Sequence, residues 1–289
     1  MITGIIGGSG LYDIDGLTDL EEIEVNTPFG APSDKFRKGK LEGHDVIFLA
    51  RHGKGHKLLP HELNHRANIW AMKSLGVESI ISMSAVGSLR KDMAPLDFVI
   101  IDQYVDHLRR QDLTFFGEGA VAHISLAEPA CEALRTQAFD AAEKVMSSEE
   151  NSPSVHPKGT YINMQGPAFS TKAESELYRK WGMDIIGMTN FGEAKLAREA
   201  EICYVTVAMV TDYDCWHPDH DAVTIEEVIG NLTSNAARAK NFLKMMIPSV
   251  KPECCHGCRE ALKTGLMSPI EAIPAATKEK LAPLLKKYL

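Results

Sequence analysis

The chain has 289 residues, of which 44% are hydrophobic, with a formal net charge of -8 and a pI near 5.8. This length and composition suffice for a large buried core, and the acidic balance excludes the broad basic surface that a nucleic-acid backbone requires. The sequence has no basic leader and no apolar run of membrane-spanning length. We therefore expect a cytoplasmic protein without nucleic-acid or membrane partners.

Apolar runs that favour β-strands alternate along the chain with patterns that favour helices. The strand-like runs span residues 2–6, 45–50, 79–84, 97–104, 159–164, 184–188 and 202–211. The helical patterns span residues 61–75, 127–145, 171–181 and 193–201. Because most of the strand-like runs are apolar throughout, helices should cover both faces of the sheet. The sequence predicts a single-domain α/β fold, with a mixed central sheet flanked by helices.

Another helix is predicted near the end of this domain. Thr224 and Glu227 form a capping box before an amphipathic pattern, and Pro248 and Pro252 end it. A short C-terminal helix is expected over residues 269–288. We therefore divide the chain into a domain of residues 1–250 and a C-terminal extension of residues 251–289.

Two predicted strands are followed by groups that could bind an anion. Gly7-Gly8-Ser9-Gly10 offers backbone amides and the Ser9 hydroxyl. It lacks the third glycine of a Rossmann fingerprint and the lysine of a P-loop, and a plain tight turn is the alternative. Arg51 and His52 follow the second run, at the edge where open α/β sheets bind ligands. The Arg51 fork could hold phosphate, although such pairs more often lie in solvated loops.

Two later segments also change from a strand into ligand-like residues. Residues 82–89, Ser-Met-Ser-Ala-Val-Gly-Ser-Leu, end in small hydroxyl residues and glycine, as a strand does where its backbone approaches a ligand. An ordinary exit from the strand is the alternative. Residues 165–170, Gln-Gly-Pro-Ala-Phe-Ser, place Phe169 after a rigid turn. This aromatic ring could stack on a base or be buried in the core.

Asp212 and Asp214 follow a very apolar strand and alternate, which should place both carboxylates on one side. Three interpretations fit this pattern. The first is a metal site, although magnesium and calcium usually recruit more oxygen ligands. The second is recognition of a base, in which a carboxylate accepts from an exocyclic amine and a protonated carboxyl donates to a ring nitrogen. The third is a solvated acidic turn.

Two patterns have the spacing of metal ligands. His61-Glu62-Leu63-Asn64-His65 matches the zincin pattern formally, but only three positions are fixed and we interpret the segment as a helix start. Cys254, Cys255 and Cys258 form a cluster in which Cys255-His256-Gly257-Cys258 has the spacing of a zinc half-site or a redox pair, without a second ligand pair nearby. The remaining cysteines lie in apolar segments and are expected to be reduced core residues: Cys131, Cys203 and Cys215.

Together these segments resemble the trimeric purine nucleoside phosphorylases, and the resemblance covers nearly all of residues 1–250. Each match is short, but the combination is specific. The matches are residues 4–10, Thr27-Pro28-Phe29-Gly30, Leu49-Ala50-Arg51-His52-Gly53, Ala67-Asn68-Ile69-Trp70-Ala71, Gly166-Pro167 with Phe169-Ser170, Ala173-Glu174-Ser175, and residues 211–216.

The resemblance assigns roles to the separate candidates. It implies a phosphate site formed by Ser9, Arg51, His52, Ser84 and Thr189. It implies that the sugar and base are bound by Ala85, Met188, Phe169, Ser170, Asp212 and Asp214, and by His123 lent from a neighbouring subunit. Asp212 and Asp214 are then the catalytic pair, with Asp212 donating a proton to N7 of the leaving purine and Asp214 holding its 6-amino edge. A homotrimer, or a dimer of trimers, is implied.

The implied reaction is phosphorolysis of 5'-methylthioadenosine to adenine and 5-methylthioribose 1-phosphate, in purine and methionine salvage. Its partners are a purine nucleoside and inorganic phosphate, the latter a co-substrate, and no cofactor or metal is expected. The chain departs from the family pattern at one residue and in one segment, with Ala168 in place of an arginine and Asn190-Phe191-Gly192 in place of a segment with proline. The family also implies that the C-terminal extension packs on the same or a neighbouring subunit.

Two alternative activities stay open. A phosphorylase for 6-oxopurines or methylthioinosine would need an amide for the oxo edge, where this sequence has Asp212. A nucleosidase would use water in place of phosphate and would not need Arg51 with its hydroxyl cluster.

Overall fold

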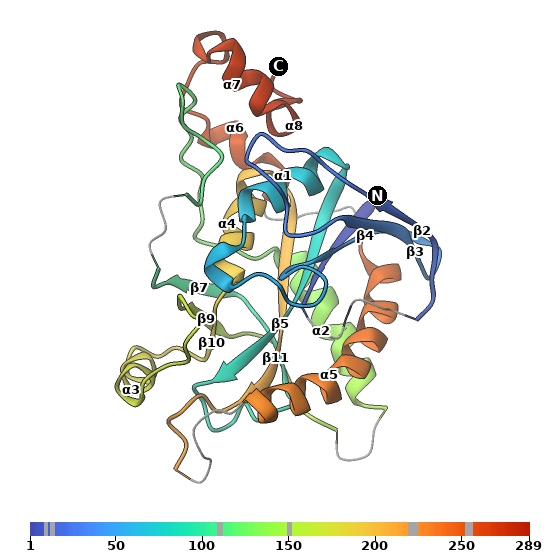
Figure 1. Ribbon diagram of the computed structural model, residues 1–289, viewed down its shortest axis with the longest axis vertical. Coiled ribbons are helices and arrows are strands. Elements are labelled where there is room, and N and C mark those ends of the chain that lie inside the picture. The colour runs from blue at the N-terminus through green and yellow to red at the C-terminus, as the bar shows by residue number, and fades with distance from the viewer. Residues whose placement is uncertain (9–10, 12–14, 109–111, 149–151, 219–224, 252–256) are drawn as a thin grey trace.

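The computed structural model describes residues 1–8, 11, 15–108, 112–148, 152–218, 225–251 and 257–289 (Figure 1). Its strands are β1 (Ile2–Gly7), β2 (Leu17–Ile23), β3 (Phe36–Leu41), β4 (His44–Ala50), β5 (Val77–Ser88), β6 (Phe98–Ile100), β7 (Gln103–Asp106), β8 (Val155–His156), β9 (Thr160–Asn163), β10 (Ile185–Gly187) and β11 (Cys203–Asp212). Its α-helices are α1 (His65–Ser74), α2 (Glu132–Met146), α3 (Lys172–Lys180), α4 (Asn190–Glu199), α5 (Ile225–Met246), α6 (Ala261–Gly265), α7 (Ala275–Lys280) and α8 (Ala282–Leu285). The predicted α/β class is confirmed.

The strands form one mixed sheet in the order β2-β3-β4-β1-β5-β10-β9-β7, with β11 pairing β5 and β6. Strands β4, β1, β5 and β11 are mutually parallel, so their carboxyl ends meet at one edge of the sheet. Strand β10 runs antiparallel to β5 and pairs the last residues of that strand. The loops that leave these strands therefore converge on one region of the molecule.

Helices cover both faces of the sheet, as Figure 1 shows for α1 and α4 on one side and α2 and α5 on the other. Alternate side chains of β5 enter two different cores, because successive residues of a strand point to opposite faces. Ile81 and Met83 pack with residues of α2 and α5, whereas Ile80 packs with residues of α1 and α4. This two-sided burial explains why β5 and β11 appear in the sequence as continuous apolar runs.

Some elements differ from the prediction. The β2–β3 hairpin was not predicted, because β2 is a largely exposed strand with the sequence LTDLEEI. The run over residues 97–104 is divided into β6 and β7. The prediction of a single helix over residues 269–288 is wrong. Pro274 precedes α7 and Pro283 lies in the first turn of α8, and because proline cannot continue a helix through its own position, two short helices form. Helix α5 follows the predicted position, but Thr224 and the Glu227 side chain of the expected capping box lie outside the described residues.

The C-terminal extension packs on its own chain in this structure. Leu281, Leu284 and Leu285 are buried in the core beneath α1 and α4. The indole of Trp70 on α1 donates a hydrogen bond of 3.0 Å to the carbonyl of Lys280. Within the described residues, no helix is both long and apolar enough to cross a membrane.

Candidate active site

A cavity of about 320 Å³ lies where the carboxyl ends of β1, β4, β5 and β11 meet. Its volume is in the range of small-molecule sites, and its wall is mostly apolar. Nine of the residues predicted for the site line it: Arg51, His52, Ser84, Ala85, Phe169, Met188, Thr189, Asp212 and Asp214. The meeting of parallel strand ends thus gathers groups that are far apart in the sequence.

Three predicted residues are not in this lining. Ser9 lies outside the described residues. Ser170 is half-buried beside the site, and its carbonyl accepts a hydrogen bond from the Cys215 thiol. His123 is exposed, and its backbone N–H donates to the carbonyl of Gly265.

Arg51 is fixed by a buried ion pair at the end of β4. Its Nε donates to Glu193 Oε1 at 2.5 Å, and Nη2 donates to Ser82 Oγ at 2.6 Å and Glu193 Oε2 at 3.3 Å. Nη1 donates to the carbonyl of Met83 at 3.0 Å. The second Nη1 hydrogen has no acceptor among the described residues, so it is left for a ligand. Arg51 therefore offers a fixed positive charge and a single donor, not the two-pronged fork expected from the sequence.

Glu193 is the functional residue that the sequence analysis missed. Its carboxylate accepts from Arg51, from the Ser82 hydroxyl at 2.7 Å and from the Tyr204 hydroxyl at 3.0 Å. Burial raises the pKa of this carboxyl, but the charge and hydrogen bonds of Arg51 outweigh burial and hold the pKa below its usual value. No sequence signal distinguished Glu193, because α4 carries other charged residues, including Lys195 and Arg198.

Asn190, the first residue of α4, completes this network. Its Nδ2 lies 2.9 Å from Ser82 Oγ and 3.2 Å from each of the Tyr204 and Thr206 hydroxyls, which share its two hydrogens. Gly192 lies against the buried His65 ring, where a Cβ atom would come within 2.9 Å of a ring carbon. Asn190 and Gly192, two residues of the segment that departs from the family pattern, are therefore each used in the packing of this chain.

His52 is held as a neutral ring with a defined tautomer. Its Nδ1 lies 2.9 Å from the carbonyl of Leu58, which can only accept, so Nδ1 carries the hydrogen. Burial, followed by the charge of Arg51, lowers the pKa of His52 to about 4. Nε2 is consequently an acceptor at neutral pH and suits a protonated phosphate oxygen.

At the opposite side of the cavity, β11 ends in two buried carboxylates. Asp212 Oδ1 accepts from the backbone N–H of Asp214 at 2.8 Å, and Asp212 Oδ2 lies 2.7 Å from the Thr211 hydroxyl. That hydroxyl is also 3.1 Å from the carbonyl of Val86 and has only one hydrogen to donate. When it donates to Val86, it can accept from a protonated Asp212.

Asp214 lies just beyond the strand, at a positive φ of 50° that aspartate tolerates better than most residues. Its Oδ2 is buried without a hydrogen-bond partner among the described residues. Burial raises the pKa of Asp214, and the nearby Ser175 and Ser170 hydroxyls offset this only in part. An unpaired buried acceptor of this kind favours a ligand that donates a hydrogen, such as an exocyclic amine.

Gly87 permits the close approach of β5 to Asp212. A Cβ atom on Gly87 would come within 2.8 Å of Asp212 Oδ1. Phe169 also lines the cavity, with 45% of its surface exposed. The alternative of a buried core position for Phe169 is therefore wrong in the single chain.

The zincin-like pattern does not form a metal site in the described residues. His61 is exposed, whereas His65 is buried and begins α1 after the N-cap Asn64, whose side chain accepts from Ala67 N. The interpretation of this segment as a helix start is confirmed. Cys254 and Cys255 lie outside the described residues.

Comparison with known proteins gives concordant matches along the chain. A family model for the phosphorylase superfamily matches residues 2–248. The S-methyl-5'-thioadenosine phosphorylase of Koribacter versatilis is 53% identical over 287 residues, which cover 99% of this chain and 96% of the relative. The protein of the same name from Thermosynechococcus vestitus is 54% identical over 292 residues, covering 99% and 98%.

Solved structures agree with this match. A methylthioadenosine phosphorylase from an Antarctic soil metagenomic library has a TM-score of 0.91 at 47% identity, covering 98% of both chains. The methylthioadenosine phosphorylase of Schistosoma mansoni, in complex with adenine, has a TM-score of 0.84 at 35% identity, covering 93% of this chain and 99% of that one.

Proposed function

We propose that this chain, which belongs to the phosphorylase superfamily, catalyses the phosphorolysis of S-methyl-5'-thioadenosine to adenine and 5-methylthioribose 1-phosphate. The names and high identity of its relatives support this activity. The observation that carries the proposal is a single cavity with a fixed cation, Arg51, on one side and two buried carboxylates, Asp212 and Asp214, on the other. Such a cavity suits a reaction between an anion and an aminopurine nucleoside.

Phosphate would lie beside Arg51, His52, Ser84 and Thr189. The Arg51 charge and the hydroxyls would neutralise and orient it, which stabilises the transition state because these groups are already fixed. A phosphate oxygen would form the new bond to the anomeric carbon as the bond from that carbon to N9 of the purine breaks. His52 Nε2 would accept the hydrogen of a protonated phosphate oxygen.

The purine would leave on the side of the two carboxylates. A protonated Asp212 would donate its proton to N7, so that adenine departs as a neutral base. Asp214 would accept from the 6-amino group through the buried oxygen that lacks a partner among the described residues. The step transfers a pentosyl group to phosphate and needs neither a metal nor an organic cofactor.

Substrate comparison tests this proposal. Adenine should be released from methylthioadenosine only when phosphate is present, and inosine should react much more slowly. Faster turnover of inosine would favour the 6-oxopurine alternative, and release without phosphate would favour a nucleosidase. Binding of methylthioadenosine without any release would indicate a binding protein.

We further propose that the chain acts as a cytoplasmic homotrimer in purine and methionine salvage. The exposure of His123 and Phe169 supports assembly, because a neighbouring subunit could bring its His123 to the open side of the cavity. Light scattering should give three times the chain mass of 31.8 kDa, or six times for a dimer of trimers. A monomer that retains full activity would contradict this part of the proposal.

A further inference from the structure

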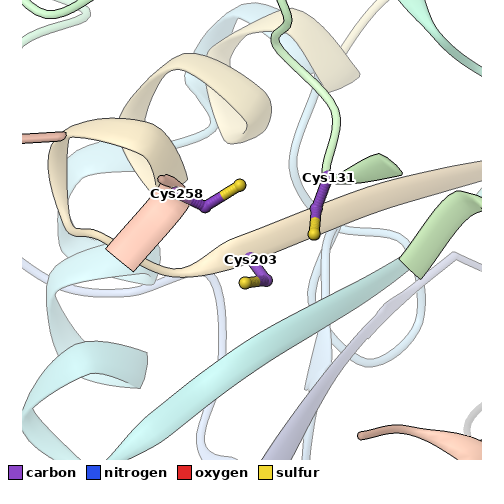
Figure 2. A group of neighbouring side chains, drawn as sticks. All are labelled: Cys131, Cys203 and Cys258. Atoms are coloured by element: carbon purple, nitrogen blue, oxygen red, sulfur yellow. The ribbon is translucent and has the colours of Figure 1, made fainter. Parts of the chain in front are cut away.

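Three cysteines from distant parts of the sequence meet in the interior, away from the cavity. Cys131 precedes α2, Cys203 begins β11, and Cys258 lies at the start of the described C-terminal extension. Their Sγ atoms all lie within 4.8 Å of one another, and each residue is at most 3% exposed. Figure 2 shows the three sulfur atoms lying around a common space. The sequence had suggested grouping Cys258 with Cys254 and Cys255 instead.

The spacing of the three sulfurs suits a common metal ion. With a metal–sulfur bond of about 2.3 Å, sulfurs in a three- or four-coordinate site lie about 3.8–4.0 Å apart. The sulfurs are already no more than 4.8 Å apart, so only small shifts separate the cluster from this spacing. A disulfide would use two of the thiols, require an oxidant and leave the third thiol buried beside it. The described cysteines form no disulfide.

The surroundings of the cluster can support thiolates. Cys131 occupies the N-cap position of the 15-residue helix α2, where the helix dipole favours negative charge. Arg198 is 7% exposed, and its charge favours the anionic form of Cys258. Three thiolates and a divalent cation carry a net charge of -1, which the single positive charge of Arg198 balances. A divalent ion therefore fits this environment better than a monovalent one.

We propose that Cys131, Cys203 and Cys258 form a structural site for a thiophilic divalent d10 cation of the zinc class. Thiolates are the preferred protein ligands of such ions, and no residue of the cluster lines the active-site cavity. The ion joins the extension and α2 to the beginning of β11, the strand that carries Asp212 at its other end. Its role is to fix the extension against the sheet.

In the metal-free protein two of the three thiols have pKa values raised above the usual range of cysteine. Hydrogen bonds with Cys203 and burial raise the pKa of Cys131, although a hydrogen bond with Cys258 opposes them. Hydrogen bonds with Cys131 and Cys203, together with burial, raise the pKa of Cys258. Metal binding must displace the protons of these thiols, so affinity should fall as the pH is lowered.

The test is a titration of the full-length protein, reduced and stripped with a chelator, with Cd2+ as a spectroscopic probe and Zn2+ as competitor. We expect one tightly bound Cd2+ per chain, with sulfur-to-metal charge-transfer absorbance that Zn2+ abolishes. The variants Cys131→Ser, Cys203→Ser and Cys258→Ser should each weaken binding by more than the roughly 100-fold that loss of an outer-shell partner can cost. Cys215→Ser, a thiol outside the cluster, should bind as the wild type does.

A second measurement requires no variant and therefore does not depend on their folding. Bound Zn2+ should protect Cys131, Cys203 and Cys258 from alkylation during partial unfolding, as identified in peptides by mass spectrometry, and should leave Cys215 unprotected. Equal alkylation with and without Zn2+, or undiminished Cd2+ absorbance in the three cluster variants, would overturn the proposal. So would a native Cys131–Cys203 disulfide.

Discussion

Asp212 and Asp214 occupy adjacent parts of the same cavity but have different partners. Asp212 is oriented by the Thr211 hydroxyl and the Asp214 N–H, whereas one oxygen of Asp214 is buried without a partner among the described residues. The first arrangement holds a carboxyl in one position for proton transfer, and the second leaves an acceptor for the substrate. This difference allows the two proposed roles to be tested separately.

Replacing the proposed proton donor should affect turnover more than phosphate binding. An Asp212→Asn variant retains the shape of the side chain but cannot act as an acid, so we expect kcat for methylthioadenosine to fall by about 100-fold or more. The KM for phosphate should stay nearly constant. Steady-state kinetics measures both, with Asp140→Asn on the exposed face of α2 as control. Unchanged kcat would remove Asp212 as the donor.

His52 should make folding stability depend on pH. Its pKa is about 4 in the folded chain and about 6.5 in the unfolded chain. Between these values the unfolded chain binds more protons at this site, so its contribution to stability is present above about pH 6.5 and is lost as the pH falls toward 4. Urea unfolding across this window should show a steeper pH dependence for the wild type than for His52→Gln. His61→Gln, at an exposed position, should keep the wild-type slope; equal slopes in all three proteins would contradict this assignment.

The candidate residues at strand ends could be predicted, because Arg51 and Asp212 follow predicted apolar strands and Ser84 ends one, at an edge where ligands usually bind. The partners that fix them could not. Glu193 is 142 residues from Arg51 in the sequence, and nothing local indicates that their side chains meet. The same limit applies to Cys131, Cys203 and Cys258, which only the three-dimensional fold brings together.

Among the secondary-structure elements, α5 has a specific connection with the end of β11. The pairing of β11 with β5 shifts register between Val210 and Asp212, so Thr211 falls at the irregularity. Asn231 on α5 donates to the carbonyl of Thr211 at 2.6 Å, and Asn235 donates to that of Val210 at 3.2 Å. The helix thereby fixes the backbone that carries the two carboxylates.

Removing this connection should reduce activity without a large loss of structure. In Asn231→Ala the Thr211 carbonyl loses its donor, which should cost about 1–3 kcal/mol and let Asp212 shift. We expect kcat to fall by about tenfold, because small displacements of catalytic groups are costly. Ser234→Ala, on the exposed side of α5, should retain wild-type kinetics. If both variants have the same kcat, α5 does not position the carboxylates.

At the scale of the whole molecule, the main domain and the C-terminal extension share a core. Ile273, Leu281, Leu284 and Leu285 pack with residues of α1 and α4, far from them in the sequence. The prediction of the overall α/β fold succeeded because apolar runs and amphipathic patterns are local properties. The β2–β3 hairpin and the broken C-terminal helices escaped prediction, because edge strands carry a weak pattern and the apolar periodicity continues past Pro274 and Pro283, where the helix does not.

This shared core predicts that the extension contributes to the stability of the entire chain. Leu285 is completely buried, so Leu285→Ala should lower the free energy of unfolding by about 2–5 kcal/mol. Leu289→Ala, at a residue 62% exposed, should change it by less than about 0.5 kcal/mol. Urea denaturation of both variants measures the difference. Equal stabilities would mean that the extension is only loosely attached.

The identity of the sugar product tests the proposed activity most directly. Methylthioadenosine and phosphate should give one equivalent of 5-methylthioribose 1-phosphate for each adenine, observed by phosphorus NMR as inorganic phosphate is consumed. In the proposed mechanism Arg51 would hold phosphate where the nucleophile must lie, which accounts for this product. Free 5-methylthioribose formed together with adenine, with no loss of inorganic phosphate, would contradict the account.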